Sequence, residues 1–273
     1  MKQAVDLRTK CAIFILAALL MLAIFAGWIA PHDPEKAQPQ LRLKSPCWDY
    51  PLGTDHLGRC IFSRILFGIR VSLFIGFSVV LFSAIMGLIL GGLASYYGGL
   101  LDEAIMRLVD AFLSFPSIFL ALAVIGFLGS GLSNLMLSLI LVDWTGYARL
   151  VRGSVLTLQG KEFLEAARSL GATDYYIMSR HILPNILPSL LVMATLSVGY
   201  VILGAASLSF LGLGVQPPTP EWGSMMNDAR PFLRTHPLMM LFPGMAITAT
   251  VLAFNLLGEG IREMLDPRSV KIE

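Results

Sequence analysis

The chain has 273 residues, of which 56% are hydrophobic and only 14% are charged. Soluble domains carry roughly a quarter charged residues, so this composition, with a mean hydropathy of +0.73, argues against an ordinary soluble protein. A formal net charge of +2 is too small to indicate a nucleic-acid partner. The three cysteines, Cys11, Cys47 and Cys60, are too few for a disulfide framework or a metal knuckle.

Long apolar segments predict an all-α membrane protein with six transmembrane helices, because about 20 apolar residues cross a bilayer. We predict the spans at Cys11–Ala30, Val71–Tyr96, Arg107–Phe127, Asn134–Leu150, Leu187–Leu211 and Leu238–Gly258. The first span lacks the small-residue cleavage site of a signal peptide. The uncharged stretch between Asp110 and Asp143 is too long for one crossing, and glycines from Gly126 to Gly131 supply a turn within it.

The spans divide the chain into three parts. Residues 1–70 hold the first span and a polar loop, 71–262 form a core of five spans, and 263–273 form a tail. Within the loop we expect Gly58–Arg70 to form a short amphipathic helix lying on the membrane. Its Arg59, Arg64 and Arg70 would then face solvent or lipid headgroups rather than a specific partner.

The second span contains small residues at strict four-residue intervals: Ser83, Gly87, Gly91 and Ser95. Small side chains let two helices approach closely in lipid, where packing drives association. We therefore predict a helix-packing face here, although small residues are also common in spans generally. One possible neighbour is a helix of a second membrane subunit.

Lysine and arginine counts set the expected orientation. With the N-terminus in the cytoplasm, twelve of the 20 basic residues lie inside: Lys2, Arg8, Lys10, Arg107, Arg149, Arg152, Lys161, Arg168, Arg180, Arg262, Arg268 and Lys271. The remaining eight lie outside. Both termini and the polar loop at 152–184 are then expected to be cytoplasmic.

That loop contains the most distinctive pattern in the chain. Phe163, Ala166, Ala167 and Leu170 recur at helical spacing and give one apolar face. Gly171 permits the positive φ that ends a helix, and Thr173 can cap a second short helix through Asp174–Arg180. The pattern predicts two short helices joined at a glycine elbow, suited to dock in the groove of another protein. An ordinary solvated loop is the alternative.

Several motifs of the sequence, taken together, resemble those of one protein family. The order Glu165-Ala-Ala, Gly171 and then His181-Ile-Leu183-Pro184 resembles the cytoplasmic EAA loop of ABC importer permeases. Pro51-Leu-Gly-Thr-Asp-His-Leu-Gly-Arg59, Gly68-Ile-Arg-Val-Ser72, Ser209-Phe-Leu-Gly-Leu-Gly214 and Glu221-Trp-Gly223 are similar to the second permease of the dipeptide, oligopeptide and nickel importer group. Cys60 departs from the family, in which Asp is expected after the Leu-Gly-Arg sequence.

The resemblance implies a type I permease fold and a set of partners. These are a second permease, two ATP-binding subunits that carry ATP and Mg²⁺, and an extracytoplasmic solute-binding protein, all at a bacterial inner membrane. It places Glu165, Ala166, Ala167 and Gly171 at the contact with an ATPase, with His181, Leu183 and Pro184 completing the motif. The chain itself would bind no cofactor.

The sequence contains no enzyme motif. It lacks a P-loop and the known nucleophile and zinc signatures, so energy for transport must come from an ion gradient or another subunit. An ion-coupled carrier or channel acting alone is the alternative class, but it should hold several ionisable groups within its spans.

Only one carboxylate, Asp143, lies plainly at the centre of a predicted span. It would line the translocation path with Tyr147, or instead form a structural hydrogen bond to Tyr147 one helical turn away. Asn255 in the sixth span is the third path candidate, with interhelical hydrogen bonding as its alternative.

The cargo follows from the resemblance alone. Met225, Met226 and His236 in the last outer loop favour nickel or a metal chelate, with di- or oligopeptides as the alternative. These residues make no complete ligand set, and no metal site is predicted. A Cys47–Cys60 disulfide is sterically possible outside the membrane, but a free, packed Cys60 is preferred.

Overall fold

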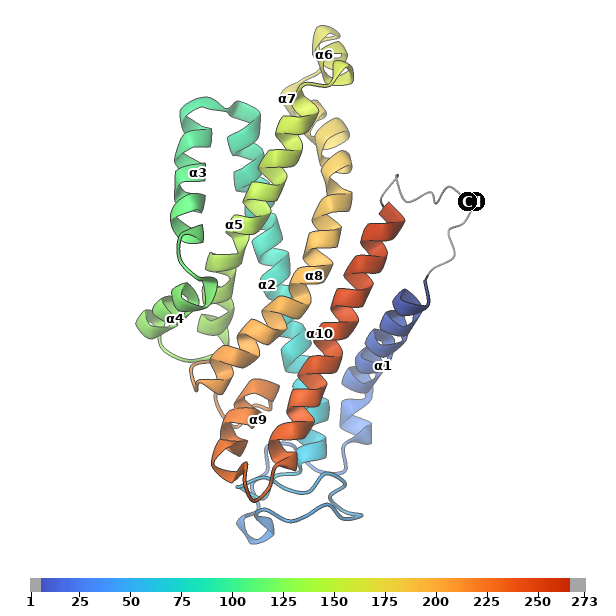
Figure 1. The fold of residues 1–273 in the computed structure, drawn as a ribbon, viewed down its shortest axis with the longest axis vertical. Helices are drawn as coiled ribbons and strands as arrows, with labels where there is room; N and C mark the ends of the chain where they lie inside the picture. Colours follow the sequence, from blue (N-terminus) through green and yellow to red (C-terminus); the bar gives the residue numbers. More distant parts are fainter. Residues whose placement is uncertain (1–5, 266–273) are drawn as a thin grey trace.

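The computed structural model describes residues 6–265, and these residues form helices and connecting loops without a β-strand. Figure 1 shows long helices packed side by side. The elements in chain order are α1 (Leu7–Ile29), η1 (Pro39–Leu41), α2 (Ile61–Tyr97), α3 (Gly99–Leu113), α4 (Ser117–Leu128), α5 (Leu132–Gln159), α6 (Glu162–Ser169), α7 (Asp174–Tyr176), η2 (Ile177–Ile182), α8 (Leu183–Phe210), α9 (Trp222–Ala229), η3 (Arg230–Phe232) and α10 (Leu238–Leu265). The predicted tail at 263–273 lies largely outside the described residues.

Four helices of the described chain are long and apolar enough to cross a membrane: α1, α2, the continuous segment Asp174–Phe210, and α10. The bent pair α3 and α4 makes a fifth if it counts as one span. Helix α5 has 28 residues, but polar side chains such as Asp143 and Arg149 interrupt its apolar sequence. The all-helical membrane fold is therefore confirmed, and the six predicted spans correspond to these six helical units.

The third predicted span, Arg107–Phe127, falls on two helices rather than one. The chain breaks between α3 and α4, and the two helices are bent by 93°. Pro116 stands at the break as the N-cap of α4, and proline disfavours helical geometry in the residue before it. The predicted glycine turn is present, because α4 ends at Leu128 and Gly129 has φ 87°.

The amphipathic helix predicted at Gly58–Arg70 is also wrong. Residues from Ile61 onward belong to α2, which continues without interruption to Tyr97. Arg59 and Arg64 are 2% and 1% exposed, so they do not face solvent or headgroups. Arg70 instead reaches α1, where its Nη2 donates to the carbonyl oxygen of Ile24 at 3.0 Å.

The small-residue ladder of α2 packs against α5 of the same chain. Ser83 and Ser95 are buried, and a Cβ at Gly87 would lie 2.3 Å from Cβ of Tyr147. A Cβ at Gly91 would lie 2.4 Å from the carbonyl oxygen of Ala148. Only glycine permits this approach, so the ladder serves the internal α2–α5 contact and gives no support for a second permease.

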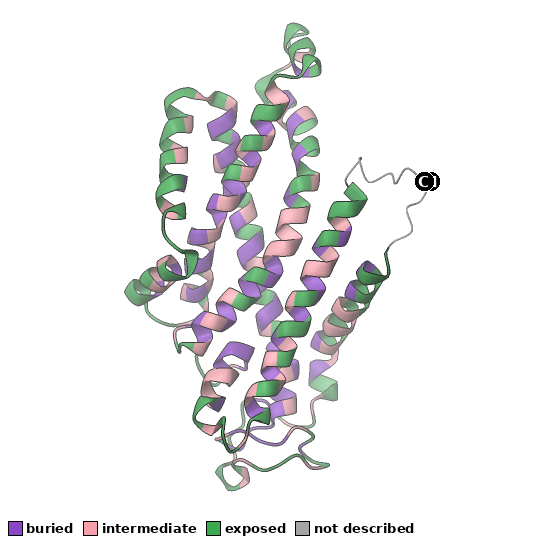
Figure 2. Ribbon diagram, viewed as in Figure 1, coloured by how far each residue is buried: buried purple, intermediate pink, exposed green. Residues whose placement is uncertain are grey.

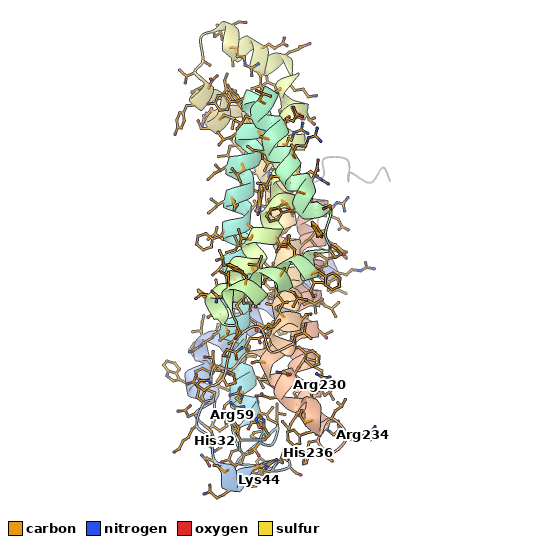
Figure 3. All side chains as sticks on the ribbon, turned by 90° about the vertical axis from the view of Figure 1, so that its left-hand side faces the viewer. His32, Lys44, Arg59, Arg230, Arg234 and His236 are labelled. Carbon is orange, nitrogen blue, oxygen red and sulfur yellow. The ribbon has the colours of Figure 1, made fainter. Side chains whose placement is uncertain are left out.

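The two ends of the molecule differ. Helix α6 projects at one end, and the start of α1 and the end of α10 point towards that end (Figure 1). The segment between α1 and α2 gathers at the opposite end with α9 and η3. Figure 3 shows His32, Lys44, Arg59, Arg230, Arg234 and His236 there.

Candidate functional site

The segment at 162–184 forms an exposed elbow at one end of the bundle (Figure 1). Helix α6 ends at Ser169, and Gly171 follows with φ 82°, a conformation that favours glycine. The Thr173 hydroxyl then accepts the backbone N–H of Tyr176 at 3.3 Å and caps the next helix. Apart from its two chain neighbours, nothing in residues 6–265 comes within 4 Å of a Cβ built at Gly171.

The predicted apolar face of α6 points outward. Phe163 is 43% exposed and Leu170 is 89% exposed, while Ala166 is also exposed. The carboxylate of Glu165 has no hydrogen-bond or ion-pair partner anywhere in residues 6–265. An exposed apolar face beside an unpaired carboxylate is suited to bind another protein.

The elbow is held to the bundle by a small buried contact. Leu164 of α6 and Ile177 of η2 are both completely buried in the main core. The His181 ring lies 6.0 Å from the ring of Phe163 and 5.5 Å from that of Tyr176 in a T-shaped arrangement. His181 thus connects α6 to the start of the following span, which is a packing position.

The sequence predicted a separate short helix after Gly171, and this prediction is wrong. Helix α7 passes through the wide turn η2 directly into α8, where the N–H of Leu183 bonds to the carbonyl oxygen of Met178, five residues earlier. Pro184 follows at the first turn of α8, where its missing N–H is tolerated. The second arm of the elbow is therefore part of one continuous helical segment, Asp174–Phe210.

The three path candidates do not form one polar cavity. Tyr147 is 1% exposed and its hydroxyl has no hydrogen-bond partner in the described chain, so the structural bond to Asp143 is absent there. Asp143 is half-buried on the same helix. Asn255 lies on α10, and its side-chain oxygen is 3.6 Å from a Cβ built at Gly199 of α8. Helix α10 packs on α8 and α1 rather than on α5.

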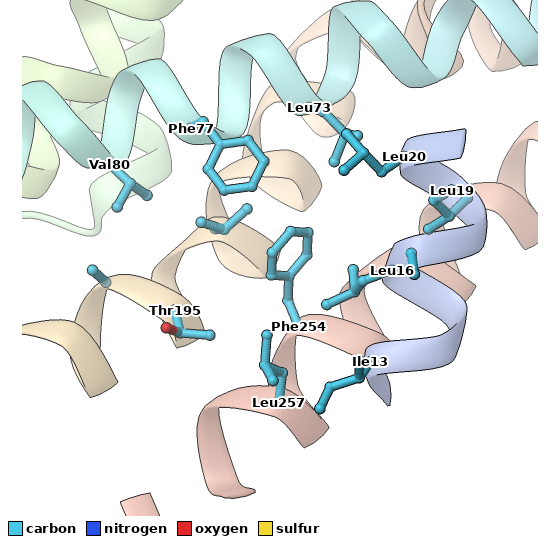
Figure 4. Close-up of a pocket in the computed structure, with 13 residues that line it drawn as sticks. Ile13, Leu16, Leu19, Leu20, Leu73, Phe77, Val80, Thr195, Phe254 and Leu257 are labelled. Carbon is cyan, nitrogen blue, oxygen red and sulfur yellow. The ribbon is translucent and has the colours of Figure 1, made fainter. Parts of the chain in front are cut away.

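A cavity of 460 Å³ lies among α1, α2, α8 and α10. Figure 4 shows its lining of aliphatic and aromatic side chains, including Leu73, Phe77 and Phe254, with Thr195 as the hydroxyl. The Thr195 hydroxyl already donates to the carbonyl oxygen of Leu191 at 2.9 Å. This cavity offers no group that would stabilise a charged cargo.

Sequence reasoning missed a buried charge network at the opposite end. Arg59 Nε donates to Asp55 Oδ2 at 2.6 Å, and Arg59 Nη2 donates to Asp228 Oδ2 at 2.9 Å. Arg64 donates to the carbonyl oxygens of Pro34 and Pro218 at 3.0 and 3.2 Å. The network ties the loop before α2 to α9. The Asp55–Arg59 spacing of four residues was visible, but the Asp228 partner lies 169 residues away.

Two further motifs of the sequence meet beside this network. Trp222 is completely buried, and its indole N–H donates to the carbonyl oxygen of Ile65 at 3.2 Å. A Cβ at Gly68 would lie 2.8 Å from that indole nitrogen, and a Cβ at Gly223 would lie 2.3 Å from the carbonyl oxygen of Ala206. The two glycines therefore permit α2, α8 and α9 to pack closely.

Metal-ligating residues are poorly placed at this end. Within the described chain, Asp55, His56 and Asp228 form a group whose ligand atoms lie within 4.8 Å of one another. Both carboxylates already bind Arg59, whose positive charge opposes a cation. Met225 is buried and His236 is half-buried. All three cysteines are free, and Cys60 is buried as predicted.

These features define a class of protein: a multi-pass helical membrane protein with an exposed elbow at one end and no ATP-binding motif in its sequence. The family described as binding-protein-dependent transport system inner membrane component matches residues 66–271. The chain belongs to this family, as a permease subunit of an ABC importer of the peptide and nickel group. Permeases of this family work with a partner permease, an ATPase and a binding protein, and they are not enzymes themselves.

Two curated relatives cover almost the whole chain. The nickel transport system permease protein NikC of Escherichia coli K12 is 44% identical over 261 residues, which is 96% of this chain and 94% of the relative. The glutathione transport system permease protein GsiD of Escherichia coli O6:K15:H31 is 48% identical over 258 residues, covering 94% and 85%. The resemblance stated from the motifs is confirmed.

Solved structures agree on the fold. The inward-facing MetNI methionine ABC transporter superposes with a TM-score of 0.59 at 21% identity, covering 76% of this chain and 98% of that one. An amino acid ABC transporter with histidines gives a TM-score of 0.56 at 15% identity, covering 72% and 92%. The type I permease fold is confirmed.

Proposed function

We propose that the elbow formed by α6, Gly171 and α7 is the surface through which an ATP-binding partner drives this permease. The single observation that carries the proposal is the outward apolar face of α6, with Leu170 almost fully exposed beside the unpaired Glu165 carboxylate. Ala166 and Ala167 leave room for close approach. Glu165 would meet a cation on the partner, where a buried ion pair fixes the register of docking.

The proposed mechanism is alternating access. Two ATPases bind ATP and Mg²⁺, close, and move the elbows of this chain and of a second permease together. The continuous helix Asp174–Phe210 carries that movement into the bundle, and the pathway between the permeases opens to the solute-binding protein. Hydrolysis and release return the elbows to their starting position.

The elbow and both chain ends are proposed to be cytoplasmic, because ATP is present only there. The start of α1 and the end of α10 point towards the end that carries the elbow. Tyr175 is 82% exposed on the elbow. In a chain whose Cys11, Cys47 and Cys60 are replaced by alanine, a Tyr175→Cys variant should react with a membrane-impermeant thiol reagent in inside-out vesicles only. Reaction in intact spheroplasts would reject this orientation.

Nickel or a nickel chelate is the proposed cargo, with glutathione-like peptides as the second candidate. The near-equal identities to the NikC and GsiD relatives support each of them. Uptake of labelled nickel and of labelled glutathione should be compared in cells lacking this chain alone. Loss of nickel uptake with unchanged glutathione uptake is expected, and the reverse pattern would make peptide the cargo.

A substitution at Gly171 tests the docking role. Gly171→Pro forces φ from 82° to about −65° and removes the N–H that bonds to the carbonyl oxygen of Arg168 at 2.9 Å. Membrane insertion should be unchanged, while ATPase co-purification and uptake should both be abolished. Gly171→Asn is the matched control, because asparagine tolerates positive φ and should retain both. Normal uptake by the proline variant would contradict the proposal.

A further inference from the structure

One side-chain hydrogen bond joins the end of α2 to the elbow. The second arm of the elbow, residues 174–182, comprises α7 and η2. Its first residue is Asp174, and the Tyr96 hydroxyl of α2 donates to Asp174 Oδ1. Within residues 6–265 no other hydrogen bond or ion pair joins α2 to the second arm. Figure 2 shows the elbow mostly exposed and the last turns of α2 partly buried, so this bond connects an exposed element to a covered one.

Apolar packing between the second arm and α2 is incomplete. A groove of 300 Å³ lies between them and α5, and its lining includes Leu88 of α2, Val155 of α5 and Ile182 of the second arm. A Cβ built at Gly92 of α2 would lie 3.6 Å from Met178 Cε, which is an ordinary contact distance. Side chains that line a groove make fewer dispersion contacts than side chains packed in a core. The connection between the second arm and α2 therefore depends strongly on the bond from Tyr96.

The end of α2 is a fixed point. Ser95 is buried, and its carbonyl oxygen accepts a hydrogen bond from Gln159 Nε2 of α5 at 2.9 Å. One turn earlier, Gly91 allows the close approach of α2 to α5. The Tyr96 ring packs against the main core. The ends of α2 and α5 thus form one unit, and Tyr96 belongs to it.

The second arm has a point at which it can bend. In η2 the N–H of Leu183 bonds to the carbonyl oxygen of Met178, five residues earlier. Helices bend at such wide turns, which often occur at functional sites. Asp174 lies at the end of the second arm that is farther from this turn. A hydrogen bond at Asp174 is therefore well placed to stop the second arm from bending away from α2.

We propose that Tyr96 is a positioning residue that latches the second arm to α2, so that a displaced elbow moves α2 and α5 together with α8. The inference rests on the proposed function, because an ATPase must displace the elbow. Without the latch, the second arm bends at η2, and part of the movement is lost before it reaches the spans. ATP is then hydrolysed with less transport. A hydrogen bond of ordinary net strength shifts such an equilibrium by about fivefold.

Single substitutions in the assembled transporter test the latch. Tyr96→Phe removes the hydroxyl and keeps the ring. Asp174→Asn keeps an oxygen that accepts the bond, whereas Asp174→Ala does not. Tyr97→Phe is the matched control, because Tyr97 is 64% exposed and its hydroxyl has no hydrogen-bond partner in the part of the chain that the structure describes. The measurements are ATPase co-purification, ATP hydrolysis in membranes, and uptake of labelled nickel and of labelled glutathione by the same cells.

Tyr96→Phe and Asp174→Ala should keep ATPase co-purification and ATP hydrolysis, while uptake per ATP hydrolysed falls about fivefold. Asp174→Asn and Tyr97→Phe should match the unaltered chain. Unchanged uptake per ATP in Tyr96→Phe would overturn the proposal, and so would an equal fall in Tyr97→Phe. Loss of ATPase co-purification in Tyr96→Phe would show that Tyr96 only maintains the shape of the elbow, and would also overturn it.

Hydrogen exchange of the purified chain separates the latch from the docking role. The backbone N–H groups of residues 174–182 should exchange about fivefold faster in Tyr96→Phe than in Tyr97→Phe, because the second arm opens more often. If the unaltered chain co-purifies no ATPase, the proposed function fails and the exchange rates alone decide the latch. Equal exchange rates in the two variants would overturn it.

Discussion

Replacing Arg59 by methionine should destabilise the fold through the partners that it leaves behind. Arg59 is 2% exposed and pairs with Asp55 and Asp228, whose side chains are 7% and 21% exposed. Removing one member of a buried ion pair costs about 3–5 kcal/mol, because the other charge remains buried. In this variant the Asp55 carboxylate still accepts hydrogen bonds from the backbone N–H groups of Leu57 and residue 59, both at 2.9 Å. Arg64 Nε also lies 3.7 Å from Asp55 Oδ2. We therefore expect the lower value, about 3 kcal/mol.

Unfolding by sodium dodecyl sulfate in mixed micelles, followed by circular dichroism, measures this loss. Arg234→Met is the matched control, since Arg234 is exposed at the same end and should change stability by less than about 0.5 kcal/mol. Adding Asp55→Asn to Arg59→Met should recover part of the loss, because the more buried of the two carboxylates is then neutral and only Asp228 lacks its arginine. A loss below about 1 kcal/mol for Arg59→Met, or full additivity in the double variant, would refute the reasoning.

Two further outcomes follow from close packing and from burial. Gly87→Val should lower the free energy of unfolding by about 3 kcal/mol in the same assay, because the new Cβ would collide with Tyr147. Gly126→Val is the control and should be near neutral, because the space around Gly126 is open. Equal losses in the two variants would contradict the α2–α5 contact. Burial raises the pKa of Glu221 above its ordinary 4.5, despite two backbone N–H donors. The folded chain holds this proton longer than the unfolded chain, so stability is lost as pH rises through the raised pKa. Glu221→Gln should remove the loss of stability at higher pH. If stability depends on pH in that variant as it does in the original chain, the raised pKa of Glu221 is not the cause.

Local pattern was sufficient for much of the architecture. Apolar segments above 20 residues predicted the spanning helices, and the glycines after Leu128 predicted the turn before α5. The elbow was also predictable, because Gly171 and Thr173 act on their immediate neighbours. Pro116 is a local signal for the break between α3 and α4, and the prediction of one span at Arg107–Phe127 did not use it.

The remaining features depend on residues far apart in the chain. Arg59 and Arg64 were predicted to lie on the surface, because no nearby residue in the sequence indicates that α9 and the loop before α2 cover them. Likewise, the small-residue ladder predicts a close helix neighbour without saying which one.

By itself, the sequence determined that this chain crosses a membrane, carries a protruding elbow and belongs with the ABC importer permeases, because composition, helix ends and short motifs are local properties. Only the tertiary structure decided which faces are covered. It buried Tyr147 and Arg59, and it left Arg107, Leu170 and Glu165 uncovered. The physical reason is that exposure is set by the helix packed alongside, and that neighbour is contributed by a distant part of the chain.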